Sequence, residues 1–165
     1  MSELAELLER FRRGAEIVAT STTGAAGPEL DFKPAEDQWS VRTILCHLTD
    51  AEMVYGMRFR QVIAEENPVM QSFDQNAWAS NLNYSKHKVS QLLESFRRLR
   101  TDNYELLKDL PESTFSRTGT HSERGKMTLL DLLQGQAAHA ENHVKQLQRV
   151  RAAYKASKTP AATTT

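Results

Sequence analysis

Hydrophobic residues recur every three or four positions along most of this chain, the spacing that places them on one face of an α-helix. The first such stretch follows Ser2, whose side chain suits the N-cap position, and its apolar residues run from Leu4 to Val18. A segment with two glycines and two prolines, at about 23–38, interrupts the pattern. The sequence therefore predicts a first amphipathic helix followed by a loop.

The second amphipathic stretch begins after Ser40, the expected N-cap, and extends to about Ala64, shortly before Pro68. Trp39 directly precedes the cap, where it could pack on Ile44 as a hydrophobic staple. This stretch is predicted to be a long helix whose apolar stripe faces the core.

Two further helices are predicted after long connections. Residues 67–83 show no long period and contain one short helical turn at about 75–79, and the third helix runs from about Ser85 to Pro111. A second connection at 111–127 precedes Thr128 and Asp131, which have the spacing of a capping box. The fourth helix carries an apolar stripe as far as Val150.

No stretch alternates in the manner of a β-strand over a convincing length. Four amphipathic helices predict an all-α four-helix bundle with long interhelical connections, stabilised by packing of the apolar stripes. We expect one domain over residues 1–151, and a flexible tail over residues 152–165, which end in KTPAATTT.

Composition narrows the classes of protein. The 165 residues are 39% hydrophobic and 25% charged, and Lys plus Arg equals Asp plus Glu at 21 each. This neutral balance gives no reason to expect a nucleic acid or a membrane as partner. The N-terminus lacks the apolar core of a signal peptide, and the lone Cys46 allows no internal disulfide, so we expect a cytoplasmic protein.

A pair of histidines in the fourth helix is the first sign of chemistry. His139 and His143 are four residues apart, which stacks their imidazoles on one helix face. Neutral imidazole is a common ligand of Zn and Ni. Two histidines satisfied by ordinary hydrogen bonds remain an equally plain interpretation of this motif alone.

His47 adds a third imidazole from the second helix, where it lies between Ile44 and Ala51 on the inward stripe. A buried imidazole needs partners for both nitrogens, and ligand sites in bundles are built from facing helices. Three nitrogens are the protein ligands of a catalytic zinc site, which leaves one position for water or substrate. His47, His139 and His143 are therefore the candidate metal ligands, although a bundle with three buried histidines and no metal remains an alternative.

Other polar residues near the predicted site are weaker candidates. Asp50 lies three residues after His47 and could orient it or act as a further ligand, with a solvated surface acid as the plain alternative. His121 precedes the last helix and could act on the substrate as acid or base, or be a simple loop residue. Arg58 could hold an anionic substrate or cofactor, unless it reaches the surface. His87 lies on a charged face and is excluded as a ligand.

Two other metal schemes do not match the spacing. A di-iron carboxylate bundle needs Glu-x-x-His on two helices, and a zinc peptidase needs His-Glu-x-x-His. In residues 139–143, HAENH, Glu141 is one position late for the second motif and wrongly spaced for the first.

The segments WSVRTILCHLTDAE (39–52), RTGTHSERGKMTL (117–129) and HAENHVKQ (139–146) together resemble the DinB-like superfamily, the DinB/YfiT-like metal-dependent hydrolases. The resemblance covers the chain to about Arg151. It implies a four-helix bundle that holds a divalent Zn or Ni ion through the positions of His47, His139 and His143. It also implies frequent homodimers and, in some members, S-transfer or isomerisation with a low-molecular-weight thiol.

The resulting hypothesis is a metal-dependent enzyme with a small-molecule substrate, acting as a thiol S-transferase or a hydrolase. The open position of the ion would take a thiol or a water molecule. The alternative is a metal-binding and dimerisation module without turnover, in which the ion only clamps the second and fourth helices.

Overall fold

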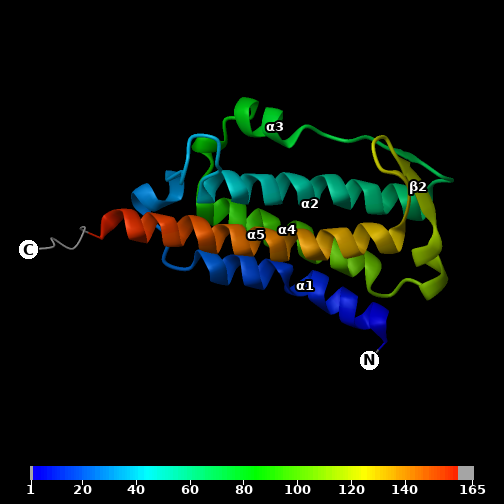
Figure 1. The fold of residues 1–165 in the computed structure, drawn as a ribbon. Helices are drawn as coiled ribbons and strands as arrows, with labels where there is room; N and C mark the ends of the chain where they lie inside the picture. The colour runs from blue at the N-terminus through cyan, green and yellow to red at the C-terminus, as the bar shows by residue number, and fades with distance from the viewer. Residues whose placement is uncertain (1, 160–165) are drawn as a thin grey trace, which may run out of the picture.

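Four long helices form the body of the protein, as the sequence predicts. The computed structural model describes residues 2–159. Its long helices are α1 (Glu3–Thr22), α2 (Val41–Ala64), α4 (Val89–Leu107) and α5 (Leu129–Lys158). They pack into a four-helix bundle (Figure 1).

The predicted caps begin three of these helices. Ser2 accepts a hydrogen bond from the backbone nitrogen of Ala5, and Ser40 accepts one from that of Thr43. Thr128 and Asp131 form the complete capping box at the start of α5. Each cap satisfies backbone N–H groups that have no partner within the helix.

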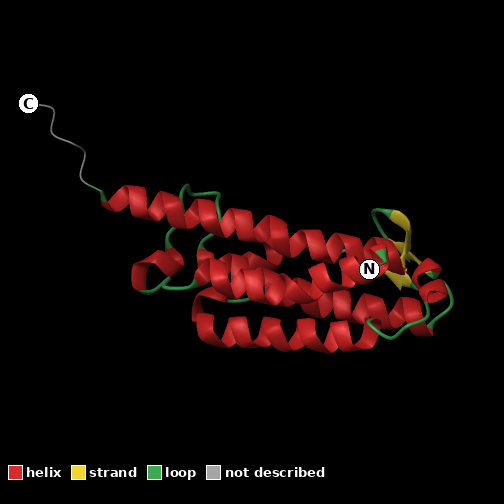
Figure 2. Cartoon of the chain, turned by 90° about the horizontal axis from the view of Figure 1, so that it is seen from below, coloured by secondary structure: helices red, strands yellow, loops and turns green. Residues whose placement is uncertain are grey.

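The packing order of the helices differs from their order in the chain. Helix α1 packs against α5 and α4, and α2 packs against the same two helices, so α1 and α2 lie across the bundle from each other (Figures 1 and 2). This arrangement makes α2 and α5 direct neighbours, which the predicted histidine site requires.

The connections contain short elements of their own. A 3₁₀ turn, η1 (Gly27–Asp31), lies between α1 and α2. The connection between α2 and α4 returns along the length of the bundle through α3 (Gln75–Asn81), which confirms the predicted helical turn, and η2 (Tyr84–Lys86) (Figure 1). Because η2 occupies residues 84–86, α4 begins a few residues later than predicted.

A small sheet at one end of the bundle was not predicted. Strands β1 (Val69–Met70), β2 (Thr118–His121) and β3 (Gly125–Thr128) follow this order, with β1 parallel and β3 antiparallel to β2. A 3₁₀ turn, η3 (Glu112–Ser116), precedes β2. Strands of two to four residues are too short for a period of two to stand out in the sequence.

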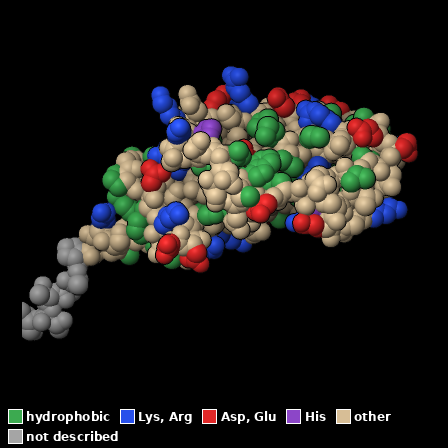
Figure 3. Space-filling view, turned by 90° about the horizontal axis from the view of Figure 1, so that it is seen from above, with side chains coloured by type: hydrophobic (Ala, Val, Ile, Leu, Met, Phe, Trp, Pro, Cys, Tyr) green, Lys and Arg blue, Asp and Glu red, His purple; other side chains and the backbone are tan. Residues whose placement is uncertain are grey.

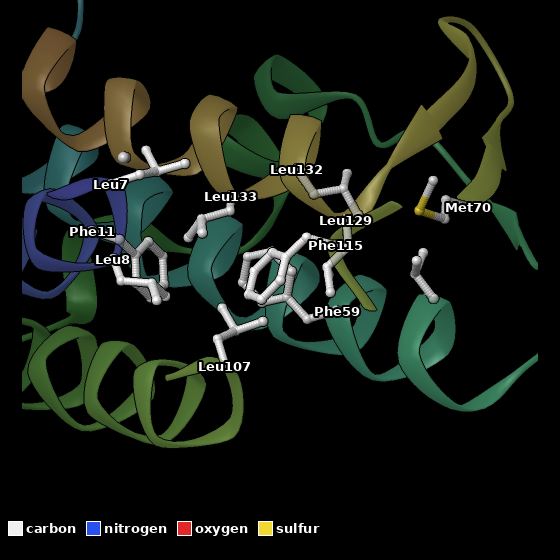
Figure 4. Packing of buried hydrophobic residues seen from close by; sticks show 12 residues of the cluster. Leu7, Leu8, Phe11, Phe59, Met70, Leu107, Phe115, Leu129, Leu132 and Leu133 are labelled. Atoms are coloured by element: carbon white, nitrogen blue, oxygen red, sulfur yellow. The ribbon is translucent and has the colours of Figure 1, made fainter. Parts of the chain in front are cut away.

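The core consists of two hydrophobic clusters, one toward each end of the bundle. The cluster nearer the sheet includes Phe11, Phe59 and Leu133, with the rings of Phe11 and Phe59 in edge-to-face contact (Figure 4). The other includes Ile44 and Leu147. Glu52 of α2 and Arg100 of α4 are buried polar residues between the positions that feed these two clusters, whereas His47 lies among the positions of the second cluster.

The last helix is longer than predicted. Helix α5 continues to Lys158, and the ring of Tyr154 lies 5.4 Å from that of Phe32. Arg151 forms an ion pair with Glu29 at 2.7 Å. The predicted tail is therefore helical over residues 152–158, and residues 160–165 lie outside the described part. Within residues 2–159, no helix has the length and apolar character needed to cross a membrane.

Candidate metal centre

The three histidines singled out in the sequence meet at one point between α2 and α5. The Nε2 atom of His139 lies 2.9 Å from Nε2 of His47 and 3.1 Å from Nε2 of His143. Two nitrogen ligands of a tetrahedral zinc ion are about 3.3 Å apart, given its usual bond lengths. These two distances, with all three ligand nitrogens within 4.8 Å of one another, are compatible with a single divalent ion.

Helix geometry and aromatic packing position the three rings. His139 and His143 project from successive turns of α5, while His47 comes from the second turn of α2. The ring of Trp39 lies 5.0 Å from that of His47 and is stacked on His143 at 6.4 Å. Trp39 thus packs against the site, a role that its position before the N-cap did not predict.

Burial keeps the imidazoles neutral at physiological pH. Burial, with a smaller contribution from nearby His143, lowers the pKa of His47 to about 4 and that of His139 to about 2. Burial also lowers the pKa of His143. Neutral imidazole is the form that binds a metal, so no proton has to leave these rings first.

A glutamine determines which nitrogen of His143 faces the centre. Nδ1 of His143 lies 2.7 Å from Oε1 of Gln146, so Nδ1 carries the ring proton and donates a hydrogen bond to this oxygen. Nε2 of the neutral ring therefore presents a lone pair to the other two histidines. Metal-bound histidines commonly donate their second ring N–H in this way.

Hydrogen bonds among the histidines cannot satisfy all of them. If Nε2 of His139 carries a proton, this single N–H has to serve both neighbouring nitrogens, at 2.9 and 3.1 Å. If Nε2 carries none, its lone pair faces that of His143 across 3.1 Å. A cation would accept all three lone pairs, so the Nε2 contacts fit a divalent ion better than a hydrogen-bonded cluster. The buried Nδ1 of His139 has no partner among residues 2–159 in either case.

No fourth protein ligand joins the cluster. Within residues 2–159, the group of metal-binding side chains contains only these three histidines. Two hollows border them. One of about 170 Å³ touches His47 and His139, and one of about 710 Å³ touches His143, Trp39 and Gln146. Small molecules can therefore approach the centre from two sides.

Asp50 is not where the sequence analysis placed it. Its carboxylate accepts a hydrogen bond from the hydroxyl group of Tyr84 in η2, and burial raises its pKa. It points toward η2 instead of α5 and is absent from the histidine cluster. Neither proposed role, extra ligand or carboxylate that orients a ligand, is supported by this position.

His121 and Arg58 both reach the smaller hollow. His121 lies in β2, not in a loop, and only 6% of its surface is exposed. Arg58 is 5% exposed, which excludes the alternative that its guanidinium reaches the surface. The structure thus places both near His47 and His139, as the sequence analysis allowed.

His87 lies outside the site, as predicted, and so does Cys46. Cys46 is buried with its sulfur 3.7 Å from the carbonyl of Tyr84, and burial raises its pKa to about 12. A thiol with such a pKa stays protonated and is a poor nucleophile. His87 is exposed.

A buried ionic network next to the histidines was missed in the sequence. Glu52 on α2 accepts hydrogen bonds from Asn103 and Gln136, both at 2.9 Å, and lies 2.7 Å from Nη2 of Arg100. The guanidinium of Arg100 also donates to the carbonyl of Phe11. The sequence offers only a weak signal: four polar residues at positions that helical periodicity would assign to the core.

Comparison with models of protein families shows to which family this chain belongs. The model of the DinB superfamily matches residues 5–147. The chain belongs to the DinB superfamily. This membership confirms the resemblance seen in the histidine-bearing segments.

Relatives within the DinB superfamily carry a common name. A protein of Oceanobacillus iheyensis named "Putative metal-dependent hydrolase" is 29% identical over 116 residues, which are 70% of this chain and 67% of that protein. YfiT of Bacillus subtilis, which has the same name, is 24% identical over 86% of this chain and 76% of its own length.

A solved structure shares the fold. It is described as "YfiT from Bacillus subtilis is a probable metal-dependent hydrolase with an unusual four-helix bundle topology". It superposes with a TM-score of 0.86 at 20% identity, covering 94% of this chain and 90% of that one. The likeness confirms the fold class, a four-helix bundle of the DinB type.

Proposed function

We propose that this DinB-superfamily protein is a metal-dependent enzyme whose His47, His139 and His143 hold a divalent ion, zinc or nickel. The convergence of three Nε2 atoms within 4.8 Å of one another, with no fourth protein ligand among residues 2–159, carries this proposal. Three protein ligands are typical of catalytic sites, whereas a purely structural zinc site normally has four.

The ion would supply a nucleophile at neutral pH, because a bound thiol or water loses its proton far more readily than in solution. The protein's own residues hold the neutral imidazoles in place. Gln146 orients the ring of His143, and Trp39 covers the rings of His47 and His143.

Two hollows at one centre favour a reaction between two molecules. The larger hollow offers space for a low-molecular-weight thiol beside His143, and the smaller one can take an electrophilic group beside His47 and His139. We therefore propose thiol S-transfer as the reaction. Hydrolysis is the second candidate, because the relatives carry the name of metal-dependent hydrolases.

The experiment compares wild type with His47→Ala and His143→Ala. Tag-free protein is loaded with zinc or nickel, its metal content is measured, and turnover is followed with cysteine as thiol and chlorodinitrobenzene as electrophile, and with ester substrates for hydrolysis. His87→Ala is the matched control, because it removes an exposed histidine. We expect near-stoichiometric metal and turnover in wild type and the control, and loss of both in the two site variants. Equal rates in all four proteins would refute the proposal.

The alternative, a binding module without turnover, predicts metal binding with no product from any substrate.

The small-molecule substrate, the homodimer and the cytoplasmic location stay predictions. Figure 3 shows hydrophobic side chains grouped on one face of the molecule, and Met53 and Met57 of α2 are exposed. Sedimentation of the wild type against Met57→Glu tests whether a homodimer uses this side of α2.

A further inference from the structure

The smaller hollow beside the histidines has a cationic wall that the metal site itself does not require. About 170 Å³ in volume, it is bordered by His47 and His139 on one side and by residues of α2 and the β2–β3 hairpin on the other. The charged or titratable side chains of this second wall other than the phenol of Tyr55 are Arg58, His121, Glu123 and Arg124, and the segment after β1 adds the neutral Ser72, Phe73 and Gln75 to the lining.

Arg58 is a buried cation without a counter-ion. Its Nη2 donates to the carbonyl of Gln71 at 2.8 Å, and its guanidinium lies 4.9 Å from the ring centre of Tyr55. Its Nε is buried and has no hydrogen-bond partner among residues 2–159. Arg100, the other buried arginine of the core, pairs with Glu52, whereas Arg58 pairs with no carboxylate of the described chain.

Burying a charge is costly unless an opposite charge or several hydrogen bonds compensate for it. A guanidinium presents five N–H groups in a plane that matches a carboxylate or phosphate. A bound anion would supply the negatively charged partner that the guanidinium of Arg58 does not have among residues 2–159.

His121 adds a second donor to the same wall. Its Nδ1 accepts hydrogen bonds from the backbone nitrogens of Glu123 and Arg124, both at 3.2 Å. The neutral ring consequently carries its proton on Nε2, where it can be donated to a ligand. Burial of the ring, followed by the neighbouring cations Arg58 and Arg124, lowers the pKa of His121 against a smaller opposing effect of Glu123, which favours this neutral form at physiological pH.

Charge and size indicate which anion fits. Arg58 and Arg124 contribute two positive charges and Glu123 one negative charge, so the wall carries a net charge of one. A carboxylate is a monoanion, whereas a phosphate monoester carries close to two charges at neutral pH. A hollow of about 170 Å³ has space for a small molecule and not for a large ligand.

We propose that Arg58, with His121 and Arg124, binds the carboxylate of a small substrate whose reacting end faces His47 and His139. This inference rests on the proposed metal-dependent function and narrows its substrates to small carboxylic acids. Arg58 is then a binding residue that orients the substrate relative to the nucleophile.

The test uses two thiols that differ in charge. Calorimetry of the zinc-loaded protein measures binding of mercaptoacetate, used here as a probe of the smaller hollow whose sulfur stands for the reacting end of the substrate and whose carboxylate is offered to Arg58, and of the neutral 2-mercaptoethanol. We expect mercaptoacetate to bind more tightly, and Arg58→Gln to weaken it about tenfold or more without changing the affinity for 2-mercaptoethanol. Arg60→Gln, which removes an exposed arginine two residues along α2, should leave both affinities unchanged.

Two further measurements keep the result interpretable. Arg124→Gln alters an exposed hairpin residue and should weaken mercaptoacetate binding even if Arg58→Gln folds poorly. On metal-free protein, thermal shifts with acetate and with inorganic phosphate report the anion site without the ion, and we expect a rise in melting temperature with acetate that Arg58→Gln abolishes.

Equal affinity for the two thiols in wild type, or equal effects of Arg58→Gln and Arg60→Gln, would overturn the carboxylate site while leaving the metal proposal intact. A larger thermal shift with phosphate than with acetate would overturn the assignment to a carboxylate. Failure of the protein to bind either zinc or nickel would instead refute the proposed function, and the acetate experiment would still decide whether the anion site exists.

Discussion

Two buried polar clusters lie side by side along α2 and α5, and they differ in whether opposite charges compensate one another. In the first, the carboxylate of Glu52 pairs with Arg100 and accepts hydrogen bonds from Asn103 and Gln136, although Nε of Arg100 and Oε1 of Gln136 have no hydrogen-bond partner among residues 2–159. In the second, His47, His139 and His143 turn their Nε2 atoms toward one another. We call the first the closed cluster, because its charges compensate within the protein, and the second the open cluster, because its three ring lone pairs suit a cation.

The largest expected effect comes from opening the closed cluster. Glu52→Ala leaves the buried guanidinium of Arg100 without its carboxylate, and we expect the free energy of unfolding to fall by about 3–5 kcal/mol. Urea unfolding measures this loss. Glu94→Ala is the control, because it removes an exposed carboxylate that pairs with Arg97 and Arg98, and it should have little effect. Similar losses in both variants would contradict the comparison.

Removing the ion tests the open cluster. At a free metal concentration a thousand times the dissociation constant, binding stabilises the folded state by about 4 kcal/mol, so chelation should lower the melting temperature without unfolding the bundle at room temperature. The chelator should have no effect on His47→Ala. A chelator response that persists in this variant would place the ion elsewhere in the protein.

Acid should destabilise the metal-free protein through the same histidines. Burial lowers the pKa of His47 to about 4, while an unfolded histidine has a pKa near 6.5. Between these values the unfolded chain takes up a proton that the folded chain does not, so stability falls as pH falls. At pH 5 this amounts to about 2 kcal/mol for His47. Urea unfolding of wild type and His47→Gln at pH 7 and pH 5 measures it: the wild type should lose about that much more.

The smallest effect is expected outside the ligands. Gln146→Ala removes the acceptor that orients His143, and we expect metal affinity to fall about tenfold with little change in the stability of the metal-free protein. Competition with a chromogenic chelator measures the affinity, and Gln148→Ala, at an exposed position of α5, is the control. An unchanged affinity in Gln146→Ala would show that the orientation of His143 does not depend on this hydrogen bond.

The open cluster could be predicted from the sequence because the spacing of residues within each helix was enough to orient its three histidines. Four-residue spacing places His139 and His143 on one face, and the apolar neighbours of His47 turn it inward. The closed cluster could not, because Glu52 and Arg100 are joined only by the packing of α2 against α4. Asp50 was misplaced for a related reason: its direction was inferred from one helix alone, whereas Tyr84 of η2 determines its contact.

The same division holds for the fold: features set by local sequence patterns were predicted, and features set by contacts between distant segments were missed. Helical periodicity and caps located the four long helices, and Thr128 with Asp131 located the start of α5. The short strands were missed because β1 is defined by its pairing with β2, and Met70 gives no sign in the sequence of its partner His121. The end of α5 was missed because its stabilising contact, between Tyr154 and Phe32, joins distant parts of the chain.

The distribution of the three histidines along the chain has a consequence for biosynthesis. His47 is made early, whereas His139 and His143 follow more than ninety residues later, in the last helix. A nascent chain on the ribosome therefore offers one imidazole until α5 has emerged. The proposed metal centre can therefore form only after α5 has been translated, so a chain that stops before α5 cannot compete for metal through this centre.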